Sequence, residues 1–229
     1  MVCDKRISLD PRLTMIAEMV GSCGCCADIG SDHGRLGAFL LQNNYCKRVV
    51  FTDISAPSLE KARKLIALLS LNDRADFRVG DGACALDRPV GAAIIAGMGG
   101  ETMADIIANA DGHLRGARLL LEPNVAAPQL RGALRDCGWR ITRETLVRDG
   151  RRIYPIIEAV EGQMQLNEPE LEVGPIFLKE QPPLLRDYAT FRIRVTEKAL
   201  AGAMHGADDE NIRSLTRSLD IWKEVEKCL

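Results

Sequence analysis

Residues 27–36 read Ala27-Asp28-Ile29-Gly30-Ser31-Asp32-His33-Gly34-Arg35-Leu36, and this run predicts the fold more directly than any other. An apolar strand breaks into a turn framed by two glycines, and a helix follows. This arrangement is typical of α/β sheets that bind a nucleotide at the carboxyl end of a strand. A second apolar run, residues 49–53, ends about twenty residues later in Asp53, where a carboxylate could accept hydrogen bonds from ribose hydroxyls. The pair predicts a Rossmann-like nucleotide site.

Asp32 departs from the usual dinucleotide-binding pattern, because it stands where that pattern has its second glycine. A carboxylate at this position would crowd and repel a pyrophosphate, which disfavours an NAD-type dehydrogenase. The same carboxylate tolerates a ligand that carries a cation. S-adenosylmethionine combines an adenosine with a positively charged sulfonium, and is therefore the cofactor that we expect.

Apolar runs alternate with helical spacing along most of the chain. Alternation of this kind predicts a mostly parallel sheet with helices on both faces. The expected strands lie at 25–29, 48–52, within 76–82, at 92–100 with a glycine-rich exit, and at 118–124. The expected helices lie at 8–20, 35–43, from 57, at 101–110 and at 126–137. Residues 139–141 and 154–160 are expected to form an antiparallel pair at the edge of the sheet.

The composition changes after residue 160, which predicts two domains, 1–160 and 161–229. Residues 161–183 are rich in Pro, Glu and Gly and are expected to be a connector. Two amphipathic patterns follow, with a break at Gly202–Asp209, and predict a coiled-coil-like α-helical hairpin. This hairpin either caps the sheet domain or forms an arm for the substrate.

The overall composition is that of a soluble globular protein, with 229 residues, 46% hydrophobic and 27% charged. The chain has no apolar run of membrane-spanning length and no signal-peptide pattern, so we expect a cytoplasmic protein. Eight cysteines include no repeated pair at zinc spacing, and three histidines are too few for a metal cluster. We therefore expect reduced, structural cysteines and no metal site.

Net charge is −2, but residues 112–152 hold nine arginines against four acidic residues. These arginines either form solvated helix faces or contact phosphate, which arginine binds in a bidentate manner.

Four strand ends carry candidate site groups: the Gly30–Gly34 turn, Asp53, Asp81 and the Ala96–Gly100 loop. In a doubly wound sheet these ends converge on one crevice. Asp81 could accept from the exocyclic amine of an adenine. The alternative for each aspartate is a helix cap or a turn, which are common at such junctions.

With these residues assembled, the chain resembles the bacterial tRNA adenine-N1 methyltransferases that act on adenine 22. The motifs that carry the resemblance are 27–33, Ala-Asp-Ile-Gly-Ser-Asp-His, then 96–100, Ala-Gly-Met-Gly-Gly, the segment 121–124, and the 153–154 strand near Glu158. The resemblance implies a class I methyltransferase domain with a C-terminal helical hairpin, S-adenosylmethionine as cofactor and tRNA as partner. No obligate protein partner is evident.

The strand ends and the resemblance together predict three groups of site residues. The catalytic group is Asp32 and Asn124. The cofactor-binding group is Asp28, Gly30, Ser31, His33, Asp53, Ile54, Gly80, Asp81, Gly82, Ala96, Gly97 and Met98. The substrate-binding group is Arg35, Gly99, Gly100, Glu122, Arg148 and Arg151.

Two positions depart from the family pattern. The family continues His-Ala-Tyr where this chain has His33-Gly34-Arg35, so a stacking role of that tyrosine is lost or passes elsewhere. The family has Gln-Pro-Asn where this chain has Glu122-Pro123-Asn124. A glutamate can accept from an adenine amine but cannot donate a hydrogen bond as an amide does.

The expected reaction is transfer of a methyl group to adenine N1, whose own lone pair is the nucleophile. Asp32 is expected to accept from the N6 amine, and the target base to be unstacked from its helix. The alternatives are a small-molecule methyltransferase, or a non-catalytic RNA-binding protein with the same fold.

Overall fold

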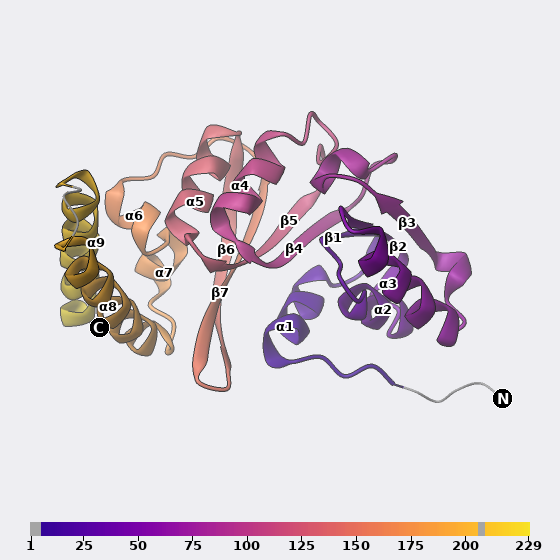
Figure 1. Cartoon of the computed structure of the whole chain (residues 1–229), viewed down its shortest axis with the longest axis horizontal. Helices are drawn as coiled ribbons and strands as arrows, with labels where there is room; N and C mark the ends of the chain where they lie inside the picture. Colours follow the sequence, from indigo (N-terminus) through magenta and orange to yellow (C-terminus); the bar gives the residue numbers. More distant parts are fainter. Residues whose placement is uncertain (1–5, 206–208) are drawn as a thin grey trace. The chain divides into compact units, whose positions relative to one another are not determined.

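The computed structural model describes residues 6–205 and 209–229. The chain divides into two compact units, Met1–Gln165 and Leu166–Leu229 (Figure 1). The sequence predicted a domain boundary after residue 160, and that boundary remains a prediction.

The first unit is built on a seven-stranded sheet with the strand order β3-β2-β1-β4-β5-β7-β6. All neighbouring pairs among β3, β2, β1, β4 and β5 are parallel, whereas β7 is antiparallel to both β5 and β6. The strands are β1 (Cys23–Ile29), β2 (Cys46–Asp53), β3 (Ala75–Val79), β4 (Ala92–Gly99), β5 (Arg118–Val125), β6 (Trp139–Asp149) and β7 (Arg152–Glu161). The predicted mostly parallel sheet with an antiparallel edge pair is confirmed.

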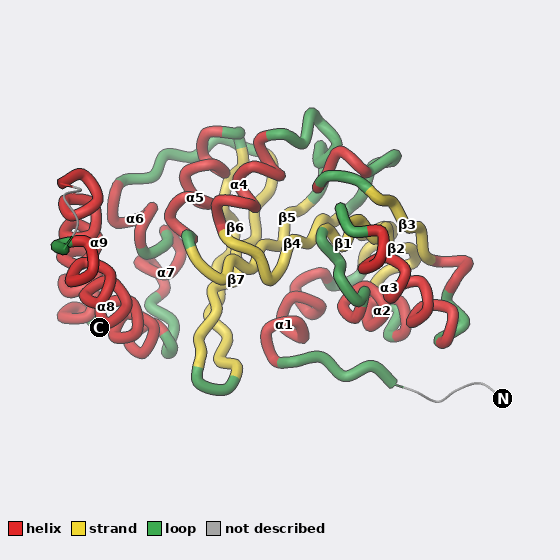
Figure 2. Tube along the Cα trace, in the orientation of Figure 1, coloured by secondary structure: helices red, strands yellow, loops and turns green. Residues whose placement is uncertain are grey.

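Helices cover both faces of this sheet, as predicted, with α1 to α3 on one face and α4 and α5 on the other (Figures 1 and 2). They are α1 (Pro11–Val20), α2 (Arg35–Gln42), α3 (Ala56–Leu68), α4 (Gly100–Ala108) and α5 (Ala127–Asp136). Short 3₁₀ turns lie at Asn72–Arg74 and Gly82–Ala85. None of the helices in the described ranges combines the length and apolar character needed to cross a membrane.

Two side-chain caps fix where helices begin on the first face. Asp10 accepts a hydrogen bond from the Leu13 amide at 2.9 Å, and Ser55 accepts from the Ser58 amide at 3.3 Å. Each cap satisfies an amide that the helix itself cannot, and such a cap is worth about 1 kcal/mol. The Ser55 cap sets the start of α3 immediately after the end of β2.

The second unit begins with two short helices where the sequence predicted a connector. They are α6 (Glu168–Glu172) and α7 (Pro175–Glu180). Each helix carries proline in its first turn, where the missing N–H costs nothing, and Asn167 and Glu170 form a capping box for α6. The sequence did not predict these two helices, because their prolines start helices rather than breaking them.

The predicted helical hairpin is formed by α8 (Leu185–Ala203) and α9 (Asp209–Cys228), which pack together. Glu172 joins α6 to both of them. Its Oε1 atom accepts from Trp222 Nε1 at 2.6 Å, from the Ser218 hydroxyl at 2.8 Å and from Arg192 at 3.2 Å. The break expected at Gly202–Asp209 falls partly on 206–208, outside the described residues.

Candidate active site

The order of strands reverses between β1 and β4, because β1 continues into β2 on one side and β4 into β5 on the other. At such a point the loops after the two strands diverge and leave a crevice at their carboxyl ends. Two cavities open there. Gly30, after β1, and Met98, near the end of β4, line both of them.

The first cavity, here called the Asp53 cavity, has a volume of about 440 Å³. Six of the predicted cofactor-binding residues line it: Gly30, Asp53, Ile54, Asp81, Gly82 and Met98. Three residues of α4, Thr102, Asp105 and Ile106, and its C-cap Asn109 form another wall, and no sequence motif indicated them. Their spacing of three, one and three residues places them on one helix face, so the periodicity of α4 could have revealed them.

Asp53 is fixed by two backbone amides. Its Oδ1 atom accepts from the Ser55 amide at 2.8 Å and its Oδ2 atom from the Asp32 amide at 3.1 Å. Each carboxylate oxygen retains acceptor capacity for a further donor. The neighbouring Ile54 is 74% exposed and gives the cavity an apolar wall next to this carboxylate. An apolar slot beside a fixed, partly free carboxylate is suited to a nucleoside.

The second cavity, here called the Asp32 cavity, has a volume of about 340 Å³. Nine predicted residues line it: Asp28, Gly30, Ser31, Asp32, His33, Arg35, Ala96, Gly97 and Met98. Three further residues, Arg12, Leu13 and Leu36, also line it. Arg12 and Leu13 belong to α1, and no motif in the sequence connects that helix to the crevice.

Asp32 has an exposed carboxylate, which contacts the His33 ring at Nδ1. Its φ of 44° lies in the left-handed region, which aspartate and asparagine tolerate better than most residues. The turn thereby holds the carboxylate at the cavity, while its own amide is bound to Asp53.

Asp28 is buried below the Asp32 cavity, and its Oδ2 atom accepts from the Gly37 amide at 3.1 Å. Burial raises the pKa of Asp28 to about 6, the Gly37 hydrogen bond acts in the opposite direction, and the negative charge of Asp53 adds to the increase. A cation placed near Asp28 would therefore favour its ionised form.

Gly30 and Met98 meet where the two cavities adjoin. A Cβ atom on Gly30 would lie 1.9 Å from the terminal methyl group of Met98. Gly30 also has a φ of 69°, which glycine adopts without strain. The glycine thus allows the Met98 side chain to lie against the β1 turn.

Glu122 is fully buried rather than open to a substrate. Its Oε2 atom accepts from Arg12 Nη1 at 2.7 Å and from the Gly97 amide at 2.9 Å. Its Oε1 atom has no hydrogen-bond partner among the described residues, and burial raises the pKa of its carboxyl group. Contrary to the expectation that Glu122 accepts from a base, its position serves to hold Arg12 and the loop at Gly97.

Seven predicted site residues line neither cavity, namely Gly80, Gly99, Gly100, Glu122, Asn124, Arg148 and Arg151. Gly100 is buried, and a Cβ atom there would lie 2.1 Å from the Ala126 carbonyl oxygen, so its lack of a side chain is explained by packing. Asn124 is exposed near the end of β5, whose Pro123 pairs with Met98.

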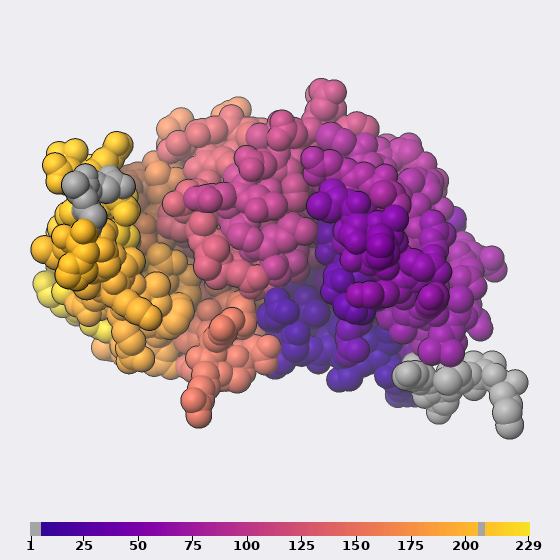
Figure 3. All heavy atoms as spheres, viewed as in Figure 1, coloured from indigo at the N-terminus to yellow at the C-terminus, as the bar shows by residue number. Residues whose placement is uncertain are grey.

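Arg148 and Arg151 lie at the turn between β6 and β7, and both are exposed. Since β7 runs antiparallel to β5, this turn lies beyond the carboxyl end of β5, at the edge that holds both cavities. The turn projects from the sheet (Figures 1 and 3).

Two arginines of residues 112–152 contact other parts of the protein and are therefore not candidates for binding phosphate. Arg131 is 1% exposed and is paired with Glu144 at 2.9 Å. Arg118 donates to the Val20 carbonyl at 2.7 Å and lies 3.7 Å from Glu158. The basic segment is therefore not a continuous surface.

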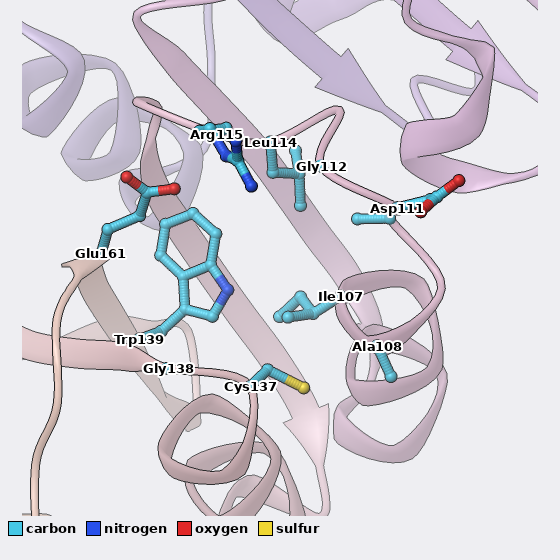
Figure 4. A pocket seen from close by; sticks show the side chains of 11 residues that line it. Ile107, Ala108, Asp111, Gly112, Leu114, Arg115, Cys137, Gly138, Trp139 and Glu161 are labelled. Carbon is cyan, nitrogen blue, oxygen red and sulfur yellow. The ribbon is translucent and has the colours of Figure 1, made fainter.

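Another cavity of about 440 Å³ lies at the opposite, amino-terminal edge of the sheet (Figure 4). Trp139, Arg115 and Glu161 point toward it from different elements, beside Cys137. It contains none of the predicted site residues. Among the described residues, no group of three or more His, Cys, Asp and Glu side chains could hold a metal ion.

Known proteins are similar to this chain in sequence and in fold. A family model described as a methyltransferase domain matches residues 9–157. The tRNA (adenine(22)-N(1))-methyltransferase of Bacillus subtilis strain 168 is 26% identical over 231 residues, which cover 96% of this chain and 97% of that protein. The crystal structure of the B. subtilis m1A22 tRNA methyltransferase TrmK has a TM-score of 0.85 at 25% identity, covering 96% of this chain and 99% of that one.

A relative from another bacterium was solved with a ligand. The Streptococcus pneumoniae protein Sp1610 in complex with S-adenosyl-L-methionine has a TM-score of 0.83 at 28% identity, covering 94% of this chain and 98% of that one. The chain belongs to the methyltransferase-domain family, and its predicted resemblance to the bacterial tRNA (adenine(22)-N1)-methyltransferases is confirmed over nearly its whole length.

Proposed function

We propose that this chain is an enzyme that transfers a methyl group from S-adenosylmethionine to N1 of adenine 22 in tRNA. The observation that carries the proposal is the pair of cavities that adjoin at Gly30 and Met98. One is suited to a nucleoside, and the other presents the exposed Asp32 carboxylate. Relatives of similar length that are named for this reaction support the choice of substrate.

The residues of the Asp53 cavity fit an adenosine. Asp53, held by two amides, would accept from the ribose hydroxyls, and Ile54 and Ile106 would cover the faces of the base. Asp81 is exposed at the cavity and would accept from the exocyclic amine. Asp28, Ser31 and Gly97 of the adjoining cavity would surround the charged amino-acid end.

Methyl transfer to adenine N1 requires positioning more than proton removal, because N1 has its own lone pair. When bound, S-adenosylmethionine supplies a methyl group on a positively charged sulfur. Asp32 would accept from the N6 amine, which orients the base and stabilises the positive charge that the adenine acquires. His33, in contact with the Asp32 carboxylate, would keep that side chain directed at the base.

The target adenine would be unstacked to reach this crevice, because N1 is engaged when the base is paired. Arg148 and Arg151 would bind tRNA phosphates from the β6–β7 turn, at the same edge as the cavities. Arg35 and Asn124 are exposed near the cavities and would contact the nucleotide. The enzyme would work in the cytoplasm with tRNA as its macromolecular partner.

Two tRNA transcripts that differ only at position 22 test the proposal. One carries adenine there and the other guanine, and both are incubated with labelled S-adenosylmethionine. We expect label in the adenine transcript and background in the guanine transcript. Equal labelling of both would place the reaction at another nucleotide. Cofactor binding without transfer to either transcript would favour a binding protein or a small-molecule methyltransferase.

A further inference from the structure

Arg12 in the first turn of α1 is held on three sides. Its Nη1 atom donates to Glu122 Oε2 at 2.7 Å, and its Nε atom lies 3.5 Å from Asp10 Oδ2. Its guanidinium carbon lies 5.3 Å from the centre of the Tyr154 ring. Such contacts fix a side chain that would otherwise sample many rotamers.

Burial of the Glu122 carboxylate costs free energy, which a purely structural role in fixing Arg12 would not justify. Its side chain is 0% exposed, and one of its oxygens lacks a partner among the described residues. Burying an ion pair removes two charges from water, and well-packed apolar side chains are often at least as stabilising. A buried carboxylate at this position therefore indicates that the placement of the Arg12 cation matters.

Arg12 lines the Asp32 cavity, and its side chain remains 23% exposed. A guanidinium has five N–H donors, and the only hydrogen bond of this group among the described residues is the one to Glu122. The donors that face neither Glu122 nor Asp10 remain available to a ligand at the cavity. Their planar fork matches the oxygens of a phosphate.

The surroundings of Arg12 favour a polyanion over a small anion. Tyr154, on which the guanidinium lies, belongs to β7, and the β6–β7 turn carries the exposed Arg148 and Arg151. Arg35 lines the same cavity as Arg12. These cations lie at the edge of the sheet to which the target nucleotide would come, so a chain of phosphates could contact several of them.

On the basis of the proposed function, we propose that Arg12 binds a phosphate of the tRNA beside the target adenine, and that Glu122 positions Arg12 for this contact. Asp32 then contacts the target base, and Arg12 contacts the sugar-phosphate backbone of the tRNA. Glu122 Oε2 also accepts from the Gly97 amide, so the same carboxylate fixes the loop that both cavities share. Arg12 is a substrate-binding residue in this arrangement, and Glu122 is a positioning residue.

The test compares Arg12→Gln and Arg12→Lys with the control Arg135→Gln. Arg135 is an arginine of α5 paired with Asp136 and lines neither cavity. We expect Arg12→Gln to raise the KM for tRNA about tenfold and to lower the salt slope of tRNA binding by about 1. The Kd for S-adenosylmethionine should stay within about twofold of wild type. Arg135→Gln should change none of these quantities.

Arg12→Lys keeps a positive charge beside Glu122 but cannot form the same fork with a phosphate. We expect its KM for tRNA to lie between those of wild type and Arg12→Gln. Melting temperatures show whether each variant is folded. If Arg12→Gln does not fold, Arg12→Lys decides the question by its KM for tRNA, because a lysine keeps the charge and should leave the salt slope unchanged.

Glu122→Gln tests the positioning role, because its amide oxygen can still accept from Gly97 but its charge is lost. We expect a smaller increase in the KM for tRNA than with Arg12→Gln. The double variant should be no worse than Arg12→Gln alone, since both changes remove the same contact.

The proposal is overturned if the folded Arg12 variants keep the wild-type KM and salt slope. It is also overturned if they weaken cofactor binding as much as tRNA binding, which would assign Arg12 to the carboxylate of the cofactor. The salt titration needs no methyl transfer. Wild-type protein that binds tRNA without methylating it would contradict the proposed function alone, whereas absence of tRNA binding would contradict both.

Discussion

Asp28 is buried at the Asp32 cavity, and its burial raises its pKa to about 6. Between the ordinary carboxyl pKa near 4 and this value, the folded protein holds more protons at this site than the unfolded chain. The contribution of Asp28 to stability therefore falls as pH rises through this window. Above pH 6 the full cost of burying its charge, up to about 3 kcal/mol, is present.

We predict that Asp28→Asn raises the free energy of unfolding at pH 8 by about 1–2 kcal/mol, because the buried charge is removed and Gly37 keeps an acceptor. The same variant should bind S-adenosylmethionine more weakly. In wild type, cofactor affinity should increase from pH 5 to pH 7 as Asp28 ionises. Urea unfolding and calorimetric titration measure these effects, with the exposed Asp136→Asn as control. A less stable Asp28→Asn at pH 8 would contradict this account.

Asp32→Asn isolates the proposed interaction with the adenine amine. Asparagine tolerates the left-handed φ of 44° as aspartate does, so the turn should keep its shape. We predict a fall in kcat of about 10²-fold with little change in the Kd for cofactor, because the neutral amide stabilises the methylated, cationic base less well. Single-turnover methyl transfer measures the step. Full turnover by the variant would exclude this role.

The sequence predicts some residues of this site much better than others. Gly30, Asp53 and Asp81 follow strands whose ends must converge, so pattern alone located them. The pairing of Arg12 with Glu122 joins positions 110 residues apart and depends on how α1 packs beside β5. Nothing local to either residue indicates such a contact, and the burial of Glu122 is a property of the folded sheet.

At the scale of elements, the start of α4 packs directly on the backbone that follows β5. A Cβ atom on Gly100 would lie 2.1 Å from the Ala126 carbonyl oxygen, which belongs to backbone and cannot turn aside. We predict that Gly100→Ala destabilises the protein by about 1–3 kcal/mol through this overlap. Thermal or urea unfolding measures the loss.

Gly132→Ala is the matched control, since Gly132 lies within α5 and a Cβ atom there would meet nothing within 4 Å. Alanine favours the helix, so this variant should be unchanged or more stable by up to about 1 kcal/mol. Equal stability of the two variants would show that α4 can shift away from Ala126 at no cost.

The elements themselves were largely predictable, because apolar periodicity and turn residues agree over residues 8–160. The exceptions have a physical reason. Proline was interpreted as a sign of a connector in residues 161–183, yet Pro169 and Pro175 occupy first helical turns. Composition alone does not distinguish a proline that starts a helix from one in a loop.

At the scale of the whole molecule, every residue that lines the two cavities lies between Arg12 and Asn109. The first unit thus contains the complete candidate cofactor site. We predict that a chain of residues 1–165 folds and binds S-adenosylmethionine with a Kd within about threefold of the full-length value. Calorimetric titration of both proteins tests this. A fragment that folds but has lost its cofactor affinity would show that Leu166–Leu229 contributes to the site.

The most direct test of the central claim is methyl transfer from labelled S-adenosylmethionine to bulk bacterial tRNA, followed by digestion of the tRNA to nucleosides. This measurement identifies the reaction and the accepting atom together. We predict that the label appears in N1-methyladenosine. Label in another nucleoside, or none in tRNA from a protein that demonstrably binds the cofactor, would contradict the account.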